Sequence, residues 1–401
     1  MSFGDYNRRM KIVHISLSGP YTEGWSYHEN MLPYWHKKLG NDVVLIARDT
    51  KYVKDSIVHC EPQKKVQDNG VILYRIRIKD KKINSWIRPK KFDLLNILFL
   101  EKPEVIWVHG VLNHFIDIVA DYKKMNNNDV IIVADNHTDF YNYGTDFLRK
   151  INLIHFRTRL KKIDPQISIY YGVTPGRVDF LSTELGIDKK KIKLSLQGGN
   201  PDEINYAAKD TIRLSFRRKY NIPDDSFIYV TGGKLDQKKK ILELIHSYSE
   251  SKSSNTRLII FGSISSDCSK AFEDALKKDS RIVFLGWLNS EETSNVFLSS
   301  DLGIFPGGHS VLWEKALACG LACCFESRTG FEHVFMGGAI KLQKENGNIL
   351  FDYDSFPTNV VFKNIHQKIQ EIRYCYLYDS IAKSSLDDFY LLKKSFHNFN
   401  D

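Results

Sequence analysis

The stretch DLGIFPGGHSVLWEKALACG, residues 301–320, decides the fold class. An apolar run that predicts a β-strand is followed by a Pro-Gly-Gly loop and then by apolar residues at helical spacing. A strand, a tight turn and a helix in this order are typical of parallel α/β sheets. Apolar residues surround Glu314 on nearly every helical angle, so the sequence predicts a buried helix with one carboxylate in its first turn.

The loop of this unit is predicted to bind a phosphate-bearing ligand. The N-terminus of a helix offers backbone N–H groups and the positive end of its dipole to anions. Gly308, His309 and Ser310 would supply these groups together with the Ser310 hydroxyl, and Glu314 would accept a hydrogen bond beside them. The alternative is a helix-capping loop in which Ser310 is the N-cap. Both interpretations can hold together.

Length and composition indicate two soluble domains. The chain has 401 residues, which suits two domains of roughly 150 to 200 residues each. Its formal charge of +9 is compatible with a nucleotide-bearing substrate, an anionic membrane surface or nucleic acid, and it does not choose among them. The six cysteines form no CxxC pair and the histidines have no zinc-site spacing, so we expect reduced structural thiols and no metal.

The cellular location follows from the absence of targeting signals. The sequence shows no signal peptide and no run of about 18 apolar residues. We therefore expect a cytoplasmic protein that is either free or bound peripherally at the inner face of the cytoplasmic membrane.

Further β-prone runs extend the same pattern through the whole chain. The first half contains KIVHIS, DVVLIA, VILYRIRI, VIWVHG and VIIVAD, and the second half contains FIYVTG, RLIIFG, RIVFLG, DLGIF and ACCF. Near-continuous apolar strands separated by helical segments indicate parallel sheets covered on both faces. We predict an N-terminal domain over 1–203, a C-terminal domain over 204–363, and C-terminal helices over 364–401 that pack back on the first domain.

Ligands of open parallel sheets collect at the carboxyl ends of the strands. The polar residues just past each apolar run are therefore the candidate site residues. In the first half they include the Ser18 to Gly24 loop, His109, Asp135, Asn136 and His137; in the second they include Gly233, Lys234, Gly262, Gly286, Trp287 and the 306–308 loop. Two such clefts facing each other would hold a nucleotide-linked molecule between the domains.

Several of these segments, in order and spacing, resemble one family. GGKLDQKKKILELIHSY at 232–248 is similar to the strand, G-[RK]-L-x-x-x-K motif and helix of the retaining, GT-B-fold glycosyltransferases of family four, also called group 1. FGS, FLGW and PGGHSVLWEKALACG follow in the family's order. The resemblance spans about residues 11 to 360. It implies two doubly wound Rossmann-like parallel-sheet domains that face a central cleft.

The resemblance also implies roles for individual residues. Lys234 and Lys239 fall on the basic positions that contact the donor's pyrophosphate, and His137 falls on the histidine beside the transferred sugar. These three are the predicted catalytic residues, and His109, Asp135 and Asn136 are acceptor-side candidates. The predicted donor-binding residues are Gly24, Gly233, Lys234, Lys239, Gly286, Trp287, Gly308, His309, Ser310, Val311 and Glu314.

Two departures from the family pattern concern the donor site. The family commonly has two glutamates eight residues apart, but position 306 is Pro here. Glu314 also lies one residue further from Gly320 than is usual, with Lys315 in the expected position. Glu314 is therefore interpreted as a ribose ligand, while the first acid is missing.

Preplaced cations lower the barrier by stabilising the charge that develops on the leaving diphosphate, so no metal is required. The only DxD sequence, Asp352-Tyr353-Asp354, is interpreted as structural. The alternatives are ordinary solvated lysines at Lys234 and Lys239, and a core histidine at His137.

The basic segment RIRIKDKKINSWIRPKKF, residues 75–92, has two interpretations. It is either a solvated loop or a surface that docks on an anionic membrane carrying a lipid-linked acceptor.

The predicted function is therefore glycosyl transfer without a cofactor. The donor would be a nucleotide sugar, UDP- or GDP-linked, and the acceptor a glycan or lipid-linked glycan in bacterial surface polysaccharide biosynthesis. The alternatives are a nucleotide-sugar epimerase of the same fold and a non-catalytic protein that binds nucleotide sugars or glycans. Nucleic-acid binding is disfavoured because no recognised motif or contiguous basic helix is present.

Overall fold

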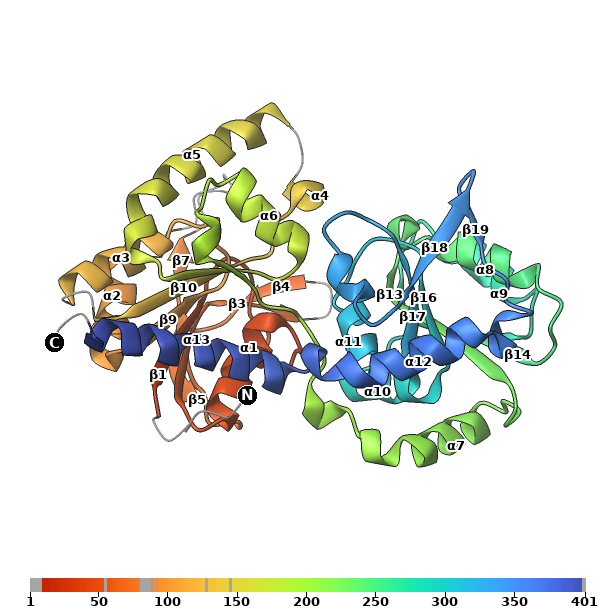
Figure 1. Ribbon diagram of the computed structural model, residues 1–401. Coiled ribbons are helices and arrows are strands. Elements are labelled where there is room, and N and C mark those ends of the chain that lie inside the picture. The colour runs from red at the N-terminus through yellow and green to blue at the C-terminus, as the bar shows by residue number, and fades with distance from the viewer. Residues whose placement is uncertain are drawn as a thin grey trace. The chain divides into compact units, whose positions relative to one another are not determined.

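The computed structural model describes residues 9–53, 56–79, 88–89, 91–126, 129–143 and 146–398. The chain divides into two compact units, Met1–Leu196 with Ile381–Asp401, and Gln197–Ser380. Each unit is an α/β structure built on one main sheet, with helices on both sides of it (Figure 1).

The main sheet of the first unit has strand order β12-β11-β10-β9-β1-β2-β6-β5. All neighbours are parallel except the β5–β6 pair at one edge. Its strands are β1 (Lys11–Ser16), β2 (Asp42–Arg48), β5 (Gln63–Val66), β6 (Ile72–Ile76), β9 (Val105–Val108), β10 (Ile131–Asn136), β11 (Ile169–Gly172) and β12 (Ile192–Leu194). Two small hairpins add β3 (Thr50–Val53) with β4 (Ser56–His59), and β7 (Ile78–Lys79) with β8 (Arg88–Pro89).

Helices and short 3₁₀ turns connect these strands. They are α1 (His28–Lys38), α2 (Lys91–Glu101), α3 (Ile116–Met125), α4 (Phe140–Tyr143), α5 (Phe147–Ile163), η1 (Asp164–Gln166), α6 (Pro175–Thr183) and η2 (Lys189–Lys191). The central strands β1, β9 and β10 are buried along almost their whole length, as the apolar runs predicted.

The second unit has strand order β15-β14-β13-β16-β17-β18-β19, parallel except for the final β18–β19 pair. Its strands are β13 (Phe227–Leu235), β14 (Thr256–Ile264), β15 (Ile282–Phe284), β16 (Leu302–Phe305), β17 (Ala322–Glu326), β18 (Ile340–Glu345) and β19 (Asn348–Leu350). Its helices are α7 (Lys209–Lys219), α8 (Ile241–Ser249), α9 (Ser269–Leu276), α10 (Ser290–Ser299), α11 (Leu312–Ala318) and α12 (Val360–Ile372).

Six 3₁₀ turns complete this unit: η3 (Pro201–Glu203), η4 (Tyr206–Ala208), η5 (Gln237–Lys239), η6 (Glu332–Phe335), η7 (Phe356–Thr358) and η8 (Arg373–Tyr376). The buried residues of the 227–365 core come from all seven strands of this sheet, from α8, α9 and α12, and from the 353–356 turn.

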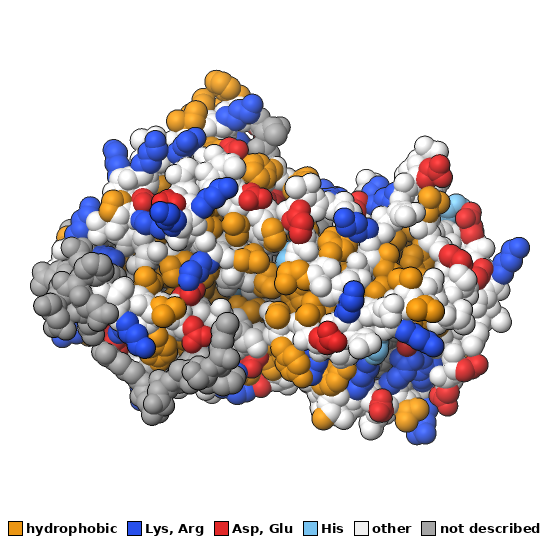
Figure 2. Space-filling view, in the orientation of Figure 1, with side chains coloured by type: hydrophobic (Ala, Val, Ile, Leu, Met, Phe, Trp, Pro, Cys, Tyr) orange, Lys and Arg blue, Asp and Glu red, His pale blue; other side chains and the backbone are white. Residues whose placement is uncertain are grey.

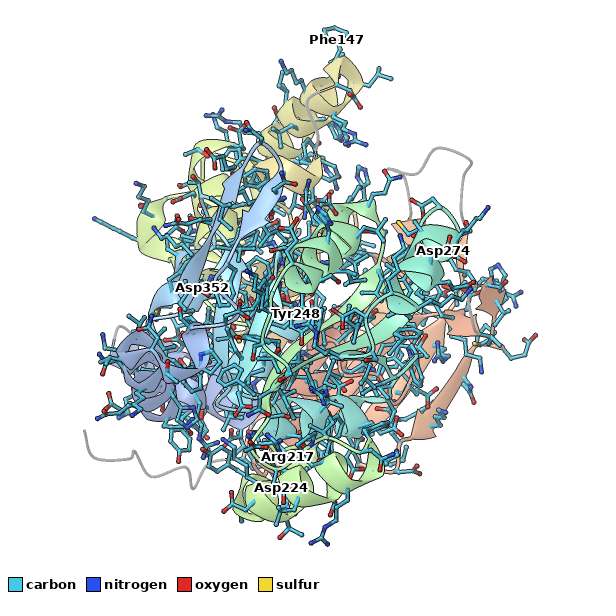
Figure 3. All side chains as sticks on the ribbon, turned by 90° about the vertical axis from the view of Figure 1, so that its right-hand side faces the viewer. Phe147, Arg217, Asp224, Tyr248, Asp274 and Asp352 are labelled. Atoms are coloured by element: carbon cyan, nitrogen blue, oxygen red, sulfur yellow. The ribbon has the colours of Figure 1, made fainter. Side chains whose placement is uncertain are left out.

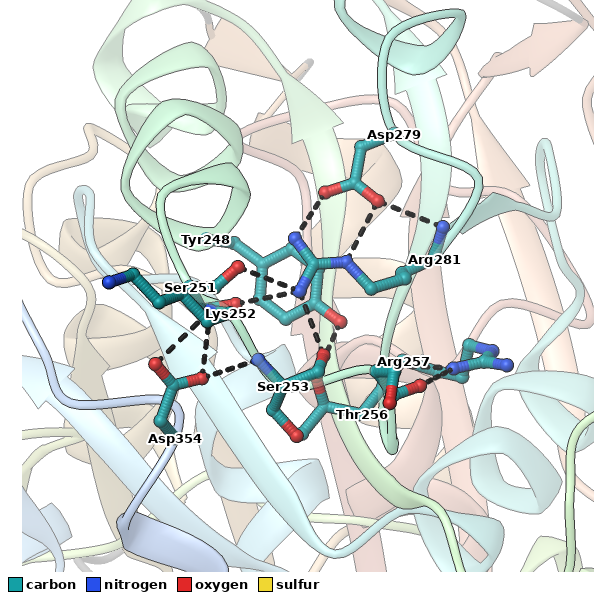
Figure 4. A network of polar contacts seen from close by, with 10 residues as sticks. Tyr248, Ser251, Lys252, Ser253, Thr256, Arg257, Asp279, Arg281 and Asp354 are labelled. Atoms are coloured by element: carbon teal, nitrogen blue, oxygen red, sulfur yellow. Dashed lines mark hydrogen bonds and ion pairs between the residues drawn. The ribbon is translucent and has the colours of Figure 1, made fainter.

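The acidic pair in the DxD sequence binds backbone groups of loops, as its structural interpretation predicted, and Figure 4 shows the contacts of Asp354. Asp354 accepts backbone N–H groups of Lys252 and Ser253 at 2.8–3.1 Å. Asp352 accepts the N–H of Asp354 at 3.1 Å. Arg281 donates to the Ser253 carbonyl at 2.9 Å, so the same loop is bound from two sides.

The C-terminal segment is divided differently from the predicted 364–401 domain. Helix α12 belongs to the second unit because Ile365 and Ile369 pack into that unit's interior. Helix α13 (Tyr378–Asn398) begins in the second unit and continues into the first from Ile381 onward. The boundary between the sheets also falls at Leu196, earlier than the predicted residue 203, because Gln197 to Glu203 pack with the second unit.

Helix α13 closes one face of the first unit. The Phe389 ring is fully buried and lies 6.1 Å from the rings of both Trp107 and His36. Asp388 accepts the Tyr171 hydroxyl at 2.8 Å and pairs with Lys193. The first sheet therefore depends on a helix that is distant in sequence.

We predict that Phe389→Ala destabilises the first unit by about 3–5 kcal/mol, because truncation of a buried Phe removes packing and leaves a cavity. Leu391→Ala on the same helix is the control, since Leu391 is 64% exposed. Native-state hydrogen exchange of β1 and β9 amides measures both changes. Equal protection in the two variants would contradict this role for α13.

Candidate functional site

The carboxyl end of β13 carries the predicted Gly-Gly-Lys motif. Gly233 pairs with Gly262 of β14, and a Cβ on Gly262 would lie 1.8 Å from the Gly233 carbonyl oxygen. Both residues also have positive φ, of 120° and 126°. Glycine is therefore required at both positions of this close approach. The side chain of the next residue, Lys234, is exposed to solvent.

The 306–310 loop lies directly against Lys238 and Lys239. A Cβ on Gly307 would lie 2.3 Å from the Lys238 carbonyl oxygen, and the Gly308 N–H donates to that oxygen at 3.1 Å. The Lys239 ammonium donates to the carbonyls of Gly308 and, at 3.3 Å, His309. Burial lowers the pKa of Lys239. The structure thus brings two of the predicted donor-binding motifs together.

Two further cations lie at this loop and were missed by the sequence analysis. An Arg328 guanidinium nitrogen is 3.8 Å from the position of a Cβ on Gly308, and Arg328 pairs with Glu326 at 2.5 Å. Lys344 donates to the Pro306 carbonyl at 2.6 Å and also to Glu326. The available signal was the position of Arg328, two residues past a buried strand.

Glu314 lies in the first turn of α11 and is completely buried, as predicted. Its Oε1 accepts hydrogen bonds from Nε2 of His309 at 2.7 Å and Nε2 of His333 at 2.9 Å. Its Oε2 is buried with no hydrogen-bond partner among the described residues. Burial alone would raise the pKa of Glu314, but the two imidazoles outweigh it and hold the pKa well below its usual range.

Ser310 is not the N-cap of this helix. The N-cap is Val311, which makes no side-chain capping bond, and the Ser310 carbonyl instead accepts the Trp313 N–H at 2.9 Å. His333, in η6, was not among the predicted site residues. No local pattern marks it, because it reaches Glu314 from a different loop.

The remaining donor-side candidates lie at the same edge of the second sheet. The Gly286 carbonyl accepts the Gly262 N–H at 2.7 Å, so the 286–287 turn adjoins the end of β14. The Trp287 side chain is 73% exposed. Both are available to a ligand at this edge.

A second buried carboxylate, Asp135, organises the carboxyl edge of the first sheet. Its Oδ2 accepts from Trp107 Nε1 at 2.8 Å and His109 Nδ1 at 2.7 Å. Its Oδ1 accepts the Gly110 N–H at 2.7 Å and lies 3.4 Å from His137 Nε2. Burial alone would raise the pKa of Asp135, but the imidazoles of His109 and His137 hold it well below its usual range.

His109 and His137 line a cavity of about 340 Å³ at this edge. The His137 side chain is 36% exposed, so the core-histidine alternative does not describe it. Asn136 instead holds the local backbone, since its Nδ2 donates to the carbonyls of Thr138 at 2.8 Å and Arg177 at 3.0 Å. Gly24, with φ of 78°, lies in the loop before α1 and outside the lining of this cavity.

A chain of buried imidazoles extends from Asp135 and was missed by the sequence analysis. His109 Nε2 is 3.1 Å from His14 Nδ1, and His14 Nε2 is 3.0 Å from His36 Nδ1. His36 Nε2 ends the chain 2.8 Å from the Ser385 hydroxyl of α13. The four residues come from β1, α1, the turn after β9, and α13, so only the folded chain brings them together.

Two sets of three side chains have ligand-type atoms within 4.8 Å of one another: His28, Asp135 and His137, and His309, Glu314 and His333. In both sets, imidazole nitrogens already lie at the carboxylate oxygens. Hydrogen bonds to Glu314 account for the approach of His309 and His333. In the other set His137 Nε2 lies 3.4 Å and His28 Nε2 lies 3.9 Å from Asp135. The absence of a metal requirement stays a prediction.

We predict that the neutral rings of His14 and His36 are Nδ1–H tautomers. An ionised Asp135 only accepts, so His109 Nδ1 must donate to it. If His109 Nε2 accepts from His14, each following imidazole donates from Nδ1 and accepts at Nε2, and the Ser385 hydroxyl, which lies 2.8 Å from both His36 Nε2 and the Ala382 carbonyl oxygen, donates to His36. Two-bond ¹H–¹⁵N NMR spectra report the tautomers. Nε2–H forms at His14 and His36 would contradict this assignment, because the Ser385 hydroxyl would then donate to Ala382 instead.

Stability should fall steeply as pH drops from 6 to 5. Burial lowers the pKa of His36 to about 3 and holds those of His14 and His28 well below their usual value. The unfolded chain takes up protons on these residues near pH 6.5 while the folded chain does not, so each costs up to about 1.4 kcal/mol per pH unit. His36→Gln should reduce the slope by about a third, and His246→Gln, whose side chain is 71% exposed, should leave it unchanged. Urea unfolding at each pH gives the slopes, and equal slopes in all three proteins would contradict the assignment.

Comparisons with known proteins agree with this architecture. Residues 213–352 match the family model described as "Glycosyl transferases group 1". A glycosyltransferase of Methanocaldococcus jannaschii is 23% identical over 305 residues, which is 73% of this chain and 74% of that protein.

Two solved structures show the same fold over nearly the full length. A glycosyltransferase from Rickettsia africae has a TM-score of 0.69 at 13% identity and covers 95% of this chain and 98% of its own. Anabaena HepE, solved with UDP and glucose, has a TM-score of 0.65 at 12% identity and covers 95% and 99%. The two parallel-dominant sheets and these solved structures show the GT-B fold over the chain, and residues 213–352 in the second unit match the group 1 glycosyltransferase model.

Proposed function

We propose that this glycosyltransferase is a retaining, metal-independent enzyme with a nucleotide-sugar donor. It transfers the sugar to a hydroxyl of a glycan or lipid-linked glycan in the synthesis of a bacterial surface polysaccharide. The donor is UDP- or GDP-linked. UDP is supported by HepE, a relative in fold that was solved with UDP and glucose.

The observation that carries this proposal is the position of Lys239 on the 306–310 loop. Its ammonium bonds the carbonyls of Gly308 and His309, and Arg328 lies beside the same loop. A nucleoside diphosphate that binds here meets fixed cations at the phosphate that becomes the leaving group. Because they are already in place, they stabilise the charge that develops as the glycosidic bond to that phosphate breaks.

His137 is proposed to contact the transferred sugar. Its Nε2 faces Asp135 Oδ1, which fixes the orientation of the ring, and the ring borders a cavity of about 340 Å³. An oxocarbenium-like sugar or its hydroxyls would therefore meet a ring that is held in place.

The test is turnover on a panel of UDP- and GDP-sugars, comparing Lys239→Ala with Lys238→Ala. Lys239→Ala should lower kcat and kcat/KM by about a hundredfold, because removing one preplaced charge costs several kcal/mol in the transition state. Lys238→Ala is the matched control, since Lys238 is exposed in the same turn. Interconversion of the donor to an epimer, or loss of turnover in EDTA with recovery in magnesium, would contradict the proposal.

Glu314→Gln tests whether the buried carboxylate serves the donor or only the helix. If Glu314 accepts the ribose hydroxyls through its unpaired Oε2, the donor KM should rise with kcat little changed, the signature of binding lost equally from ground and transition states. Because His309 and His333 both donate to Oε1, some loss of stability is also expected. If the donor affinity is unchanged and the melting temperature is lower, Glu314 acts only as a structural hydrogen-bond acceptor.

A further inference from the structure

Helix α5 has an apolar face on the side opposite to its buried face. Phe156, Leu160 and Ile163 are buried against the first unit. Phe147, Ile151 and Ile154 follow the spacing of the other face and are 75%, 49% and 65% exposed, with Leu148 beside them at 77%. A helix on a folded domain ordinarily has a polar outer face, so these side chains need another explanation.

Basic residues flank this exposed apolar face. The helix FLRKINLIHFRTRLKKI contains Arg149, Lys150, Arg157, Arg159, Lys161 and Lys162, and it contains no Asp or Glu. By helical spacing, Lys150, Arg157 and Lys161 border the apolar face on one side and Lys162 on the other. Figure 2 shows apolar side chains gathered at the outer end of α5 with Lys and Arg beside them, and Phe147 points away from the unit in Figure 3.

We propose that α5 is a membrane-docking helix whose partner is an anionic lipid bilayer. Phe147, Leu148, Ile151 and Ile154 enter the boundary between headgroups and acyl chains, while the flanking Lys and Arg contact anionic headgroups. A large apolar face bordered by cations is the pattern of helices that lie in a membrane interface. Near an anionic surface each cation adds to the attraction.

A second copy of the chain is a poorer partner for this face. A two-fold interface through α5 would bring the same face of each copy together. The basic residues that border it would then meet like charges, with no acidic residue on the helix to pair with them. A bilayer with anionic headgroups satisfies both the apolar and the basic parts of the surface.

A cavity of about 370 Å³ lies on the inner side of α5, lined in part by Arg149, Asn152 and Phe156. It shares Ser18, Leu112 and Thr138 with the cavity that His109 and His137 line. Docking through α5 would therefore place the route to His137 next to the membrane, where a lipid-linked acceptor resides. This last step rests on the proposed function, whereas membrane docking itself does not.

The test is cosedimentation of the full chain with vesicles of phosphatidylglycerol and phosphatidylcholine, compared with vesicles of phosphatidylcholine alone. Wild type should bind the anionic vesicles at least tenfold more tightly, and less so as salt rises. An apolar variant, Phe147→Gln with Leu148→Gln, Ile151→Gln and Ile154→Gln, should lose at least tenfold in binding. A charge variant, Lys150→Gln with Arg157→Gln, Lys161→Gln and Lys162→Gln, should lose at least as much and show a weaker salt dependence.

Matched control variants carry four substitutions to Gln at exposed positions outside α5. Leu100, Val360, Val361 and Leu391 are 67%, 68%, 50% and 64% exposed, and their change to Gln should leave vesicle binding within twofold. The control for the charge variant changes four other exposed lysines to Gln: Lys189, Lys190, Lys277 and Lys278. Donor turnover on a soluble acceptor should be equal in all variants, so failure of docking is distinguished from failure of the proposed function.

A tryptophan added in α5 reports insertion when its signal is taken as the difference from the wild type, which has six tryptophans of its own. Phe147→Trp fluorescence should shift to the blue and be quenched by lipids brominated in their acyl chains, while Leu100→Trp should show neither change. The proposal is overturned if wild type does not bind anionic vesicles, or if the apolar variant binds as its control does. It is also overturned if binding is lost only when Lys81, Lys82, Arg88, Lys90 and Lys91 of the 75–92 segment are changed to Ser. A dimer in sedimentation velocity that the apolar variant dissociates would assign the face to a second copy instead.

Discussion

Each unit has a fully buried carboxylate at the carboxyl edge of its sheet. The structure of the surrounding site depends on the hydrogen-bond donors that reach this carboxylate. An ionised carboxylate removed from water is costly unless several donors reach it. Asp135 is satisfied by the indole of Trp107, a backbone N–H and two imidazoles. Glu314 is satisfied at Oε1 by the imidazoles of His309 and His333. Each carboxylate thereby fixes the orientation of the imidazole rings around it.

This requirement links distant parts of the chain to the site. Asp135 holds His109, from which the imidazole chain runs through His14 and His36 to α13, so the C-terminal helix contributes to the interior beneath His137. Glu314 holds His309 at the loop on which the Lys239 ammonium rests. The half-exposed His137 in the first unit and the largely buried His309 in the second are therefore both oriented by a buried carboxylate. Such orientation before the substrate arrives is what electrostatic stabilisation of a transition state requires.

Short-range patterns were enough to predict much of this architecture. Nearly continuous apolar runs identified the central strands, and the 301–320 stretch identified β16, the glycine loop and a helix that buries Glu314. The Tyr-rich strand Ile169–Gly172 and the antiparallel edge strands were missed because they lack a long apolar run. His14, His36, His333 and Ser385 could not be assigned because each acts through a partner that only the fold brings near. Arg328 could have been found, since it follows a buried strand as the predicted residues do. The 75–92 segment lies partly outside the described residues, and its docking role stays a prediction.

The central claim is that a nucleoside diphosphate binds the second unit where the 306–310 loop meets Lys239. Amide hydrogen exchange with and without saturating UDP or GDP tests it most directly. The account predicts slower exchange in two segments, 232–240 and 306–314, with the effect lost in Lys239→Ala and the first unit's β10 amides unchanged. Protection confined to the first unit, or exchange that neither nucleotide alters, would contradict the account.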